Sequence, residues 1–78
     1  MKYYEIYLGM EYACCFRANK DVSPEEAAQF VKKYDTTVSN EDASFFRDIT
    51  YFGEITEKAA YEAYDEAHIL SMPILGAE

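Results

Sequence analysis

The stretch "KYYEIYLGMEYACCFRA", residues 2–18, decides the fold, because it holds two runs of β-favouring residues with one break between them. Aromatic and aliphatic side chains are frequent in both runs, 2–8 and 11–18, and Gly9 separates them. Two such runs joined by a short glycine-containing turn are typical of a β-hairpin. The chain is therefore predicted to begin with two antiparallel strands.

The register of this hairpin depends on the length of its loop. A two-residue loop at Gly9-Met10 suits a type II′ turn and places Leu8 on the same face as Glu11. A three-residue loop groups apolar and aromatic side chains on one face: Tyr4, Ile6, Leu8, Tyr12, Cys14 and Phe16. The other face then carries Tyr3, Glu5, Tyr7, Ala13, Cys15 and Arg17. A one-residue slip exchanges the faces, so the cleaner apolar face favours the three-residue loop.

The segment "VSPEEAAQFVKKY" carries a clear helix start. Ser23 is an N-cap residue, Pro24 suits the first helical position, and Glu26 completes a capping box. On a helical wheel one arc is apolar: Ala27, Ala28, Phe30, Val31 and Tyr34. This pattern predicts an amphipathic helix that covers one face of the sheet.

The segment "DTTVSNEDASFFRD", residues 35–48, is followed by a third β-favouring run. Ser39 and Asp42 resemble a second capping box, which predicts a short helix near 40–47. Apolar alternation predicts a strand over 49–55, in which Gly53 is expected to mark a bulge or a close backbone approach.

A second main helix is expected from residue 57 to about 68, with Thr56 as its N-cap. Pro73 interrupts the apolar tail 69–78, so the helix is expected to end before the tail. The tail contains five large apolar residues, which must dock on this domain or on another subunit: Ile69, Leu70, Met72, Ile74 and Leu75.

These elements predict an α+β fold in a single small domain, residues 1–78. The expected core is an antiparallel sheet of about three strands, formed by the N-terminal hairpin plus one later strand. Two main helices pack on it, in the order β-β-α-(α)-β-α. Seventy-eight residues leave little room for a second domain.

The net charge of −8 is unevenly distributed along the chain. Residues 1–39 hold six acidic and five basic residues, whereas residues 40–78 hold nine acidic and two basic residues. Such a field repels nucleic acid and anionic membranes and attracts basic protein surfaces. No leader or membrane-spanning segment is recognised, so a cytoplasmic protein is expected.

The helix expected at 57–68 combines an apolar stripe with an acidic face. Small residues and one tyrosine form the stripe: Ala60, Ala63, Tyr64 and Ala67. Carboxylates lie on the helix face opposite this stripe. They either form a solvated face or bind a partner. Tyrosine next to carboxylate is a good recognition surface, unless a helix or the tail covers that sheet face. The candidate partner-binding residues are Glu54, Glu57, Tyr61, Glu62, Asp65, Glu66, Tyr3 and Tyr7.

His68 is the one histidine in the chain and gives little indication of catalysis or metal binding. Asp65 and His68 could supply two ligands from one helix face, but a complete site needs three or four. Cys14 and Cys15 are adjacent, so on a strand they point to opposite faces and are expected to be reduced thiols. No nucleophile stands in a recognisable motif. No enzyme activity, cofactor or metal is therefore expected.

In length, charge and the helix acids Glu57, Glu62, Asp65 and Glu66, the chain resembles small acidic inhibitor proteins of phages and mobile elements. These include anti-CRISPR and DNA-mimic proteins, and the resemblance rests on general character without a shared motif. It implies an interaction domain that occupies a basic nucleic-acid-binding surface of a defence or DNA-processing protein. The alternative is an assembly module that self-associates, for example as a homodimer, through its tyrosine-rich sheet face or apolar tail.

Overall fold

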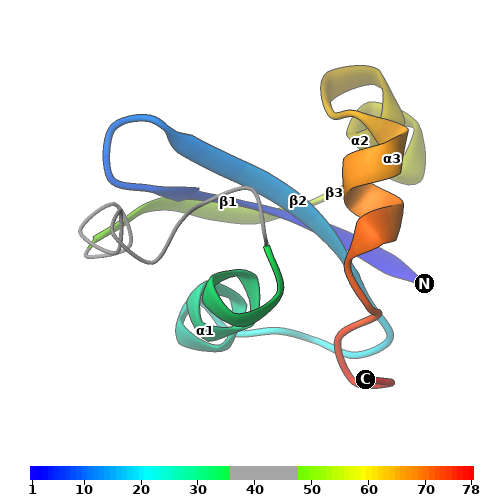
Figure 1. The fold of residues 1–78 in the computed structure, drawn as a ribbon, viewed down its shortest axis with the longest axis horizontal. Coiled ribbons are helices and arrows are strands. Elements are labelled where there is room, and N and C mark those ends of the chain that lie inside the picture. The colour runs from blue at the N-terminus through cyan, green and yellow to red at the C-terminus, as the bar shows by residue number, and fades with distance from the viewer. Residues whose placement is uncertain (36–47) are drawn as a thin grey trace.

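The α+β fold predicted from the sequence is confirmed by a computed structural model, which describes residues 1–35 and 48–78 (Figure 1). The described residues form β1 (Lys2–Leu8), β2 (Tyr12–Ala18), α1 (Pro24–Tyr34), β3 (Ile49–Ile55), α2 (Glu57–Ala63) and α3 (Glu66–Ser71). The short helix expected near 40–47, with Ser39 and Asp42, lies outside them. Within the described ranges, no helix has the length and apolar character needed to cross a membrane.

The hairpin has the register of the three-residue loop, as predicted. Leu8 pairs with Tyr12 and Lys2 pairs with Ala18, and Gly9 takes a positive φ of 63° in the loop. β3 pairs with the other side of β1, so the strand order is β2-β1-β3, all antiparallel. The irregularity of the β1–β3 ladder lies between Tyr7 and Leu8, so the bulge, one of the two alternatives expected at Gly53, is not found there.

One face of the sheet packs on α1 and forms the larger core. Ser23 caps α1 by accepting a hydrogen bond from the Glu26 amide at 3.2 Å, as the sequence predicts. Side chains from the hairpin, from α1 and from the C-terminal tail are buried together: Tyr4, Ile6, Leu8, Cys14, Phe16, Ala18, Val22, Ala27, Ala28, Phe30, Val31, Met72 and Leu75. Phe16 stacks on Tyr4, with ring centroids 5.9 Å apart, and contacts the tilted ring of Phe30 at 5.2 Å.

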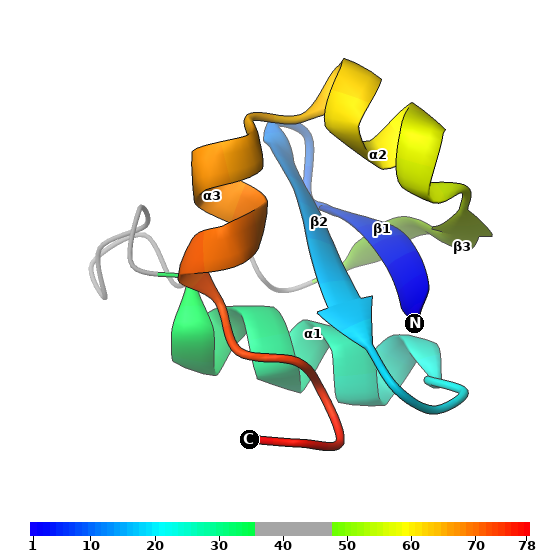
Figure 2. The same cartoon turned by 90° about the vertical axis from the view of Figure 1, so that its right-hand side faces the viewer.

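The other face of the sheet is partly covered by α2 and α3 (Figure 2). The prediction of a single helix over 57–68 is wrong, because α2 ends before Tyr64, whose backbone is extended (φ −129°, ψ 150°). In this conformation the Tyr64 hydroxyl donates to Glu5 Oε2 on β1 at 2.8 Å. Asp65 then caps α3 by accepting from the Ala67 amide. The helical wheel drawn across the break therefore does not apply.

The helix α3 lies beside β2 and connects the two cores (Figures 1 and 2). Ile69 is buried with Cys15 on the α2 side, whereas Met72 is buried on the α1 side. The tail docks on its own domain, which is one of the two expected arrangements: Arg17 donates to the Met72 carbonyl at 2.8 Å. Ala18 forms a parallel bridge with Leu75. The helix continues to Ser71 and so ends later than predicted.

Two neighbouring residues test this placement of α3. Ile69 is fully buried, whereas Leu70 is 48% exposed. Ile69→Ala is expected to lower the free energy of unfolding by about 2–5 kcal/mol, because it removes buried methyl groups and leaves a cavity. Leu70→Ala is the matched control and should change it by no more than about 0.5 kcal/mol. Urea denaturation followed by circular dichroism measures both values, and equal effects would contradict the orientation of α3.

Candidate functional site

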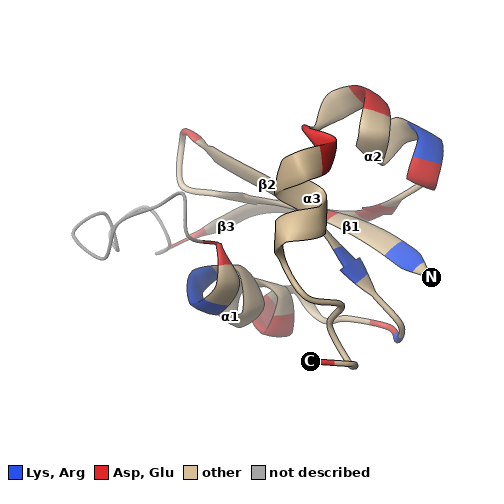
Figure 3. Ribbon diagram, turned by 45° about the vertical axis from the view of Figure 1, so that its right-hand side comes forward, with Lys and Arg blue, Asp and Glu red and all other residues tan. Residues whose placement is uncertain are grey.

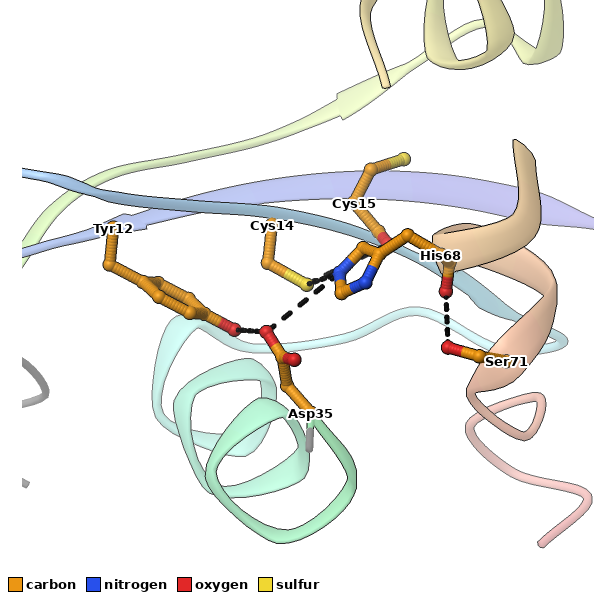
Figure 4. Close-up of polar contacts among 6 residues, drawn as sticks. All are labelled: Tyr12, Cys14, Cys15, Asp35, His68 and Ser71. Carbon is orange, nitrogen blue, oxygen red and sulfur yellow. Dashed lines mark hydrogen bonds and ion pairs between the residues drawn. The ribbon is translucent and has the colours of Figure 1, made fainter. Parts of the chain in front are cut away.

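Three residues from separate parts of the chain meet where β2, α1 and α3 come together (Figure 4). Cys14 Sγ lies 3.6 Å from His68 Nε2, and Asp35 Oδ2 lies 3.8 Å from the same nitrogen. The Tyr12 hydroxyl donates a short hydrogen bond to Asp35 Oδ2. The thiol, carboxylate and imidazole atoms all lie within 4.8 Å of one another. We call Cys14, Asp35 and His68 the Cys-Asp-His cluster.

Local structure explains how each side chain reaches the cluster. The hairpin register turns Cys14 toward α1 and Cys15 toward the opposite face, as Figure 4 shows. Asp35 follows the last residue of α1, where its amide donates to the Val31 carbonyl at 2.9 Å. His68 lies in the middle of α3, which runs beside β2.

The position of Asp35 is electrostatically unfavourable. Its side chain is only 2% exposed, and burial of a carboxylate costs free energy unless it is paired and hydrogen-bonded. It also lies at the C-terminus of α1, where the helix dipole disfavours negative charge. The Tyr12 hydroxyl and the nearby His68 ring offset this cost. Residues that break a local rule in this way are concentrated at functional sites.

The cluster does not have the geometry of a nucleophile–histidine–acid triad. In a triad the nucleophile and the acid contact opposite ring nitrogens, whereas here Cys14 and Asp35 both face Nε2. Burial raises the pKa of the Cys14 thiol to about 12, and the Cys14 side chain is fully buried. A protonated, inaccessible thiol is a poor nucleophile.

Asp65, the residue that the sequence pairs with His68 as a possible ligand, does not contact it. Asp65 uses its carboxylate to cap α3, and the carboxylate near His68 belongs to Asp35 instead. The cysteine was assigned correctly as a reduced thiol, and both cysteines are free. The sequence does mark Asp35 as unusual, because it places an acidic residue at the C-terminal end of the predicted helix, where the helix dipole disfavours negative charge.

A second candidate site lies on the half of the sheet that α2 and α3 leave uncovered. Tyr7 and Tyr51 are 39% and 46% exposed, and their ring centroids are 5.1 Å apart. Tyr51 leans over Gly53, where a Cβ would come within 2.7 Å of the tyrosine hydroxyl. Burial and the hydrogen bond to Glu5 raise the pKa of Tyr64, with a contribution from nearby Tyr7. We call Tyr7, Tyr51 and Tyr64 the tyrosine surface.

Acidic residues lie at the junction of α2 and α3, on both sides of Tyr64 in the sequence (Figure 3). Glu62, Asp65 and Glu66 are all exposed there, and we call these three residues the acidic elbow. Lys58 lies 4.0 Å from Glu62 in a pair that is largely exposed and therefore weak.

The other predicted partner-binding residues have mixed positions. Tyr3 was a candidate only if its sheet face stayed open, and the alternative holds here: α2 covers this part of the face and leaves Tyr3 7% exposed. Tyr61 covers it, with ring centroids 5.6 Å apart and hydroxyl oxygens 3.2 Å apart. Glu54 and Glu57 are exposed as expected. Glu54 lies on the α1 side of β3, opposite Tyr4, and so apart from the tyrosine surface.

Of the alanines expected to form a buried stripe, Ala60 is buried, whereas Ala63 and Ala67 are exposed. The prediction of one continuous buried stripe is wrong, because the helix ends at Ala63 and the chain is extended at Tyr64.

No protein-family model matches the chain, and no curated protein or solved structure is found to be similar to it. Function is therefore inferred from the two candidate sites.

The hydrogen bond between Tyr12 and buried Asp35 can be tested by deleting one hydroxyl. Tyr12→Phe is expected to lower the free energy of unfolding by about 1–3 kcal/mol, because the buried carboxylate loses a donor. Tyr51→Phe, at an exposed position, is the control and should have an effect below about 0.5 kcal/mol. Chemical denaturation at neutral pH gives both values. An unchanged stability for Tyr12→Phe would show that this bond contributes nothing.

The two thiols should be inert in the folded protein. Burial raises the pKa of Cys14 to about 12 and that of Cys15 to about 11, from an ordinary 9.0. A disulfide reagent at pH 8 should therefore modify neither thiol before denaturation and both afterwards. Because the folded state keeps protons that the unfolded chain loses, the free energy of unfolding should fall as pH rises from about 9 through 11 to 12. Rapid labelling of the folded protein would contradict this environment.

Proposed function

We propose that this protein is an interaction domain that binds a basic protein surface through the tyrosine surface and the acidic elbow. The supporting observation is the exposed Tyr7–Tyr51 pair, on the part of the sheet face that α2 and α3 leave open, together with three exposed carboxylates that flank Tyr64 in the sequence. Tyrosine contributes rigid contact area and a hydrogen-bonding tip, and carboxylates select for Lys and Arg. The net charge of −8 would accelerate encounter with such a partner.

The proposed partner is the nucleic-acid-binding surface of a defence or DNA-processing protein. Such surfaces are arrays of Lys and Arg that neutralise phosphates, and a rigid set of carboxylates can occupy the same positions. The acidic elbow is suited to this because Asp65 and Glu66 start a helix while Glu62 lies near the end of another. Three charges are thus presented at one corner of the fold.

The alternative is self-association through the tyrosine surface. It is favoured by the position of β3 at an edge of the sheet and by the exposure of Ile49 and Tyr51 on that strand. The apolar tail is no longer a good candidate for this role, since Met72 and Leu75 are buried in the same chain. Sedimentation across a wide concentration range separates the alternatives, because only self-association gives a concentration-dependent mass without a partner.

The partner hypothesis predicts a selective effect of charge removal. The triple variant Glu62→Gln, Asp65→Asn, Glu66→Gln removes three negative charges and keeps an Asn cap on α3. Proteins captured from lysate of the source cell at low salt are identified by mass, purified and titrated with each variant. Binding of the true partner should weaken at least about tenfold, since each lost charge contact contributes to affinity and association rate. Added salt should weaken it further.

The matched control is Asp21→Asn, Glu25→Gln, Glu78→Gln, which removes the same charge at exposed positions outside the acidic elbow. This control should bind within about twofold of the unmodified protein. Duplex DNA or RNA should compete with the unmodified protein for the partner. Equal affinities for the two triple variants, or no competition by nucleic acid, would overturn the proposal.

A further inference from the structure

We propose that the Cys-Asp-His cluster binds a divalent transition-metal ion, and that zinc is the ion its ligands fit best. Thiolate, imidazole and carboxylate are the three protein ligand types that Zn²⁺ takes. Here one of each converges from β2, the end of α1 and α3, within 4.8 Å of one another. The inference is independent of the proposed partner surface, which uses none of these three side chains.

The distances agree with a tetrahedral ion. Zinc bonds of about 2.3 Å to sulfur and about 2.0–2.2 Å to nitrogen or oxygen place neighbouring ligand atoms roughly 3.3–3.6 Å apart. The sulfur–nitrogen distance between Cys14 and His68 is 3.6 Å, and the nitrogen–oxygen distance between His68 and Asp35 is 3.8 Å. The Cys14 sulfur and the Asp35 oxygen lie within 4.8 Å of each other, so these two ligands would move closer together on binding.

The direction of the contacts also favours an ion. Cys14 Sγ and Asp35 Oδ2 both lie close to Nε2, so all three atoms face a common point. A hydrogen-bonded chain would use the two ring nitrogens of His68 separately. A cation bound at this point would make three coordinate bonds, in place of the long contacts that His68 Nε2 now makes with Cys14 and Asp35.

A bound ion would balance the charges of this buried site. On coordination the Cys14 thiol releases its proton to solvent, and His68 binds as the neutral imidazole. The divalent cation is then matched by one thiolate and one carboxylate, so the site is neutral overall. The ion would also compensate Asp35 for its burial and for its position at the C-terminal end of α1.

Tyr12 acts as a positioning residue for this site. Its hydroxyl holds the Asp35 carboxylate from the side of β2, and such outer contacts orient metal ligands. The described part of the chain supplies three ligands, and water would fill the fourth position of a tetrahedral ion. His68, with a side chain 22% exposed, marks the side from which an ion can enter.

The test measures metal binding by the intact chain. After treatment with a chelator, the protein is dialysed against zinc chloride, and its zinc content and Tm are measured. One zinc per chain is expected, with a rise in Tm of at least about 10 °C when zinc is in hundredfold excess over its Kd. Cobalt chloride should give the charge-transfer absorption of a cobalt–thiolate bond, which reports directly on a cysteine ligand.

Neighbouring cysteines supply the matched variants. Cys14→Ala should weaken zinc binding at least about tenfold and abolish the cobalt–thiolate absorption. Cys15→Ala removes an equally buried thiol from the opposite sheet face and should leave both unchanged. His68→Gln, at a partly exposed position, should also weaken zinc binding and serves if Cys14→Ala fails to fold. Unchanged zinc binding by a folded Cys14→Ala or His68→Gln, or absence of a cobalt–thiolate band in the unmodified protein, overturns the proposal.

Discussion

The register of the N-terminal hairpin is the constraint on which the rest of this structure depends. The three-residue loop, with Gly9 at positive φ, pairs Leu8 with Tyr12 and so fixes which side chains share a face. A slip of one residue in β2 would exchange every one of its side chains between the faces. Cys14 would then move away from α1, and Cys15 would take its place. Both the larger core and the Cys-Asp-His cluster therefore require this register.

The unequal lengths of helix and strand explain why one sheet face is partly open. A seven-residue strand extends about 23 Å, whereas a seven-residue helix extends only about 10 Å. Helix α2 covers the end of the face that carries Tyr3, and its break at Tyr64 directs the chain toward the edge of β2. The remaining part of the face keeps Tyr7 and Tyr51 at the surface. The tyrosine surface is thus a consequence of where α2 ends.

Local patterns in the sequence were sufficient for the strands, the register and α1, because each is determined by alternation or by capping within a few residues. The break at Tyr64 had no glycine or proline to mark it. It depends on a contact with Glu5, 59 residues away, and on the capping of α3 by Asp65. The end of α3 was placed too early because Pro73 restricts only the residue before it, Met72, which is indeed extended.

The Cys-Asp-His cluster could not be predicted for a related reason, since it depends on the path of α3 past the edge of β2. Consecutive residues of α3 pack on different sides of the sheet: Ile69 lies on the α2 side and His68 lies on the α1 side. A six-residue helix is too short to be stable by itself, so its position depends on these tertiary contacts. Asp65 and Glu66 of the acidic elbow begin the same helix. The contacts that hold His68 near Asp35 consequently also hold two of the three exposed carboxylates in place beside the tyrosine surface.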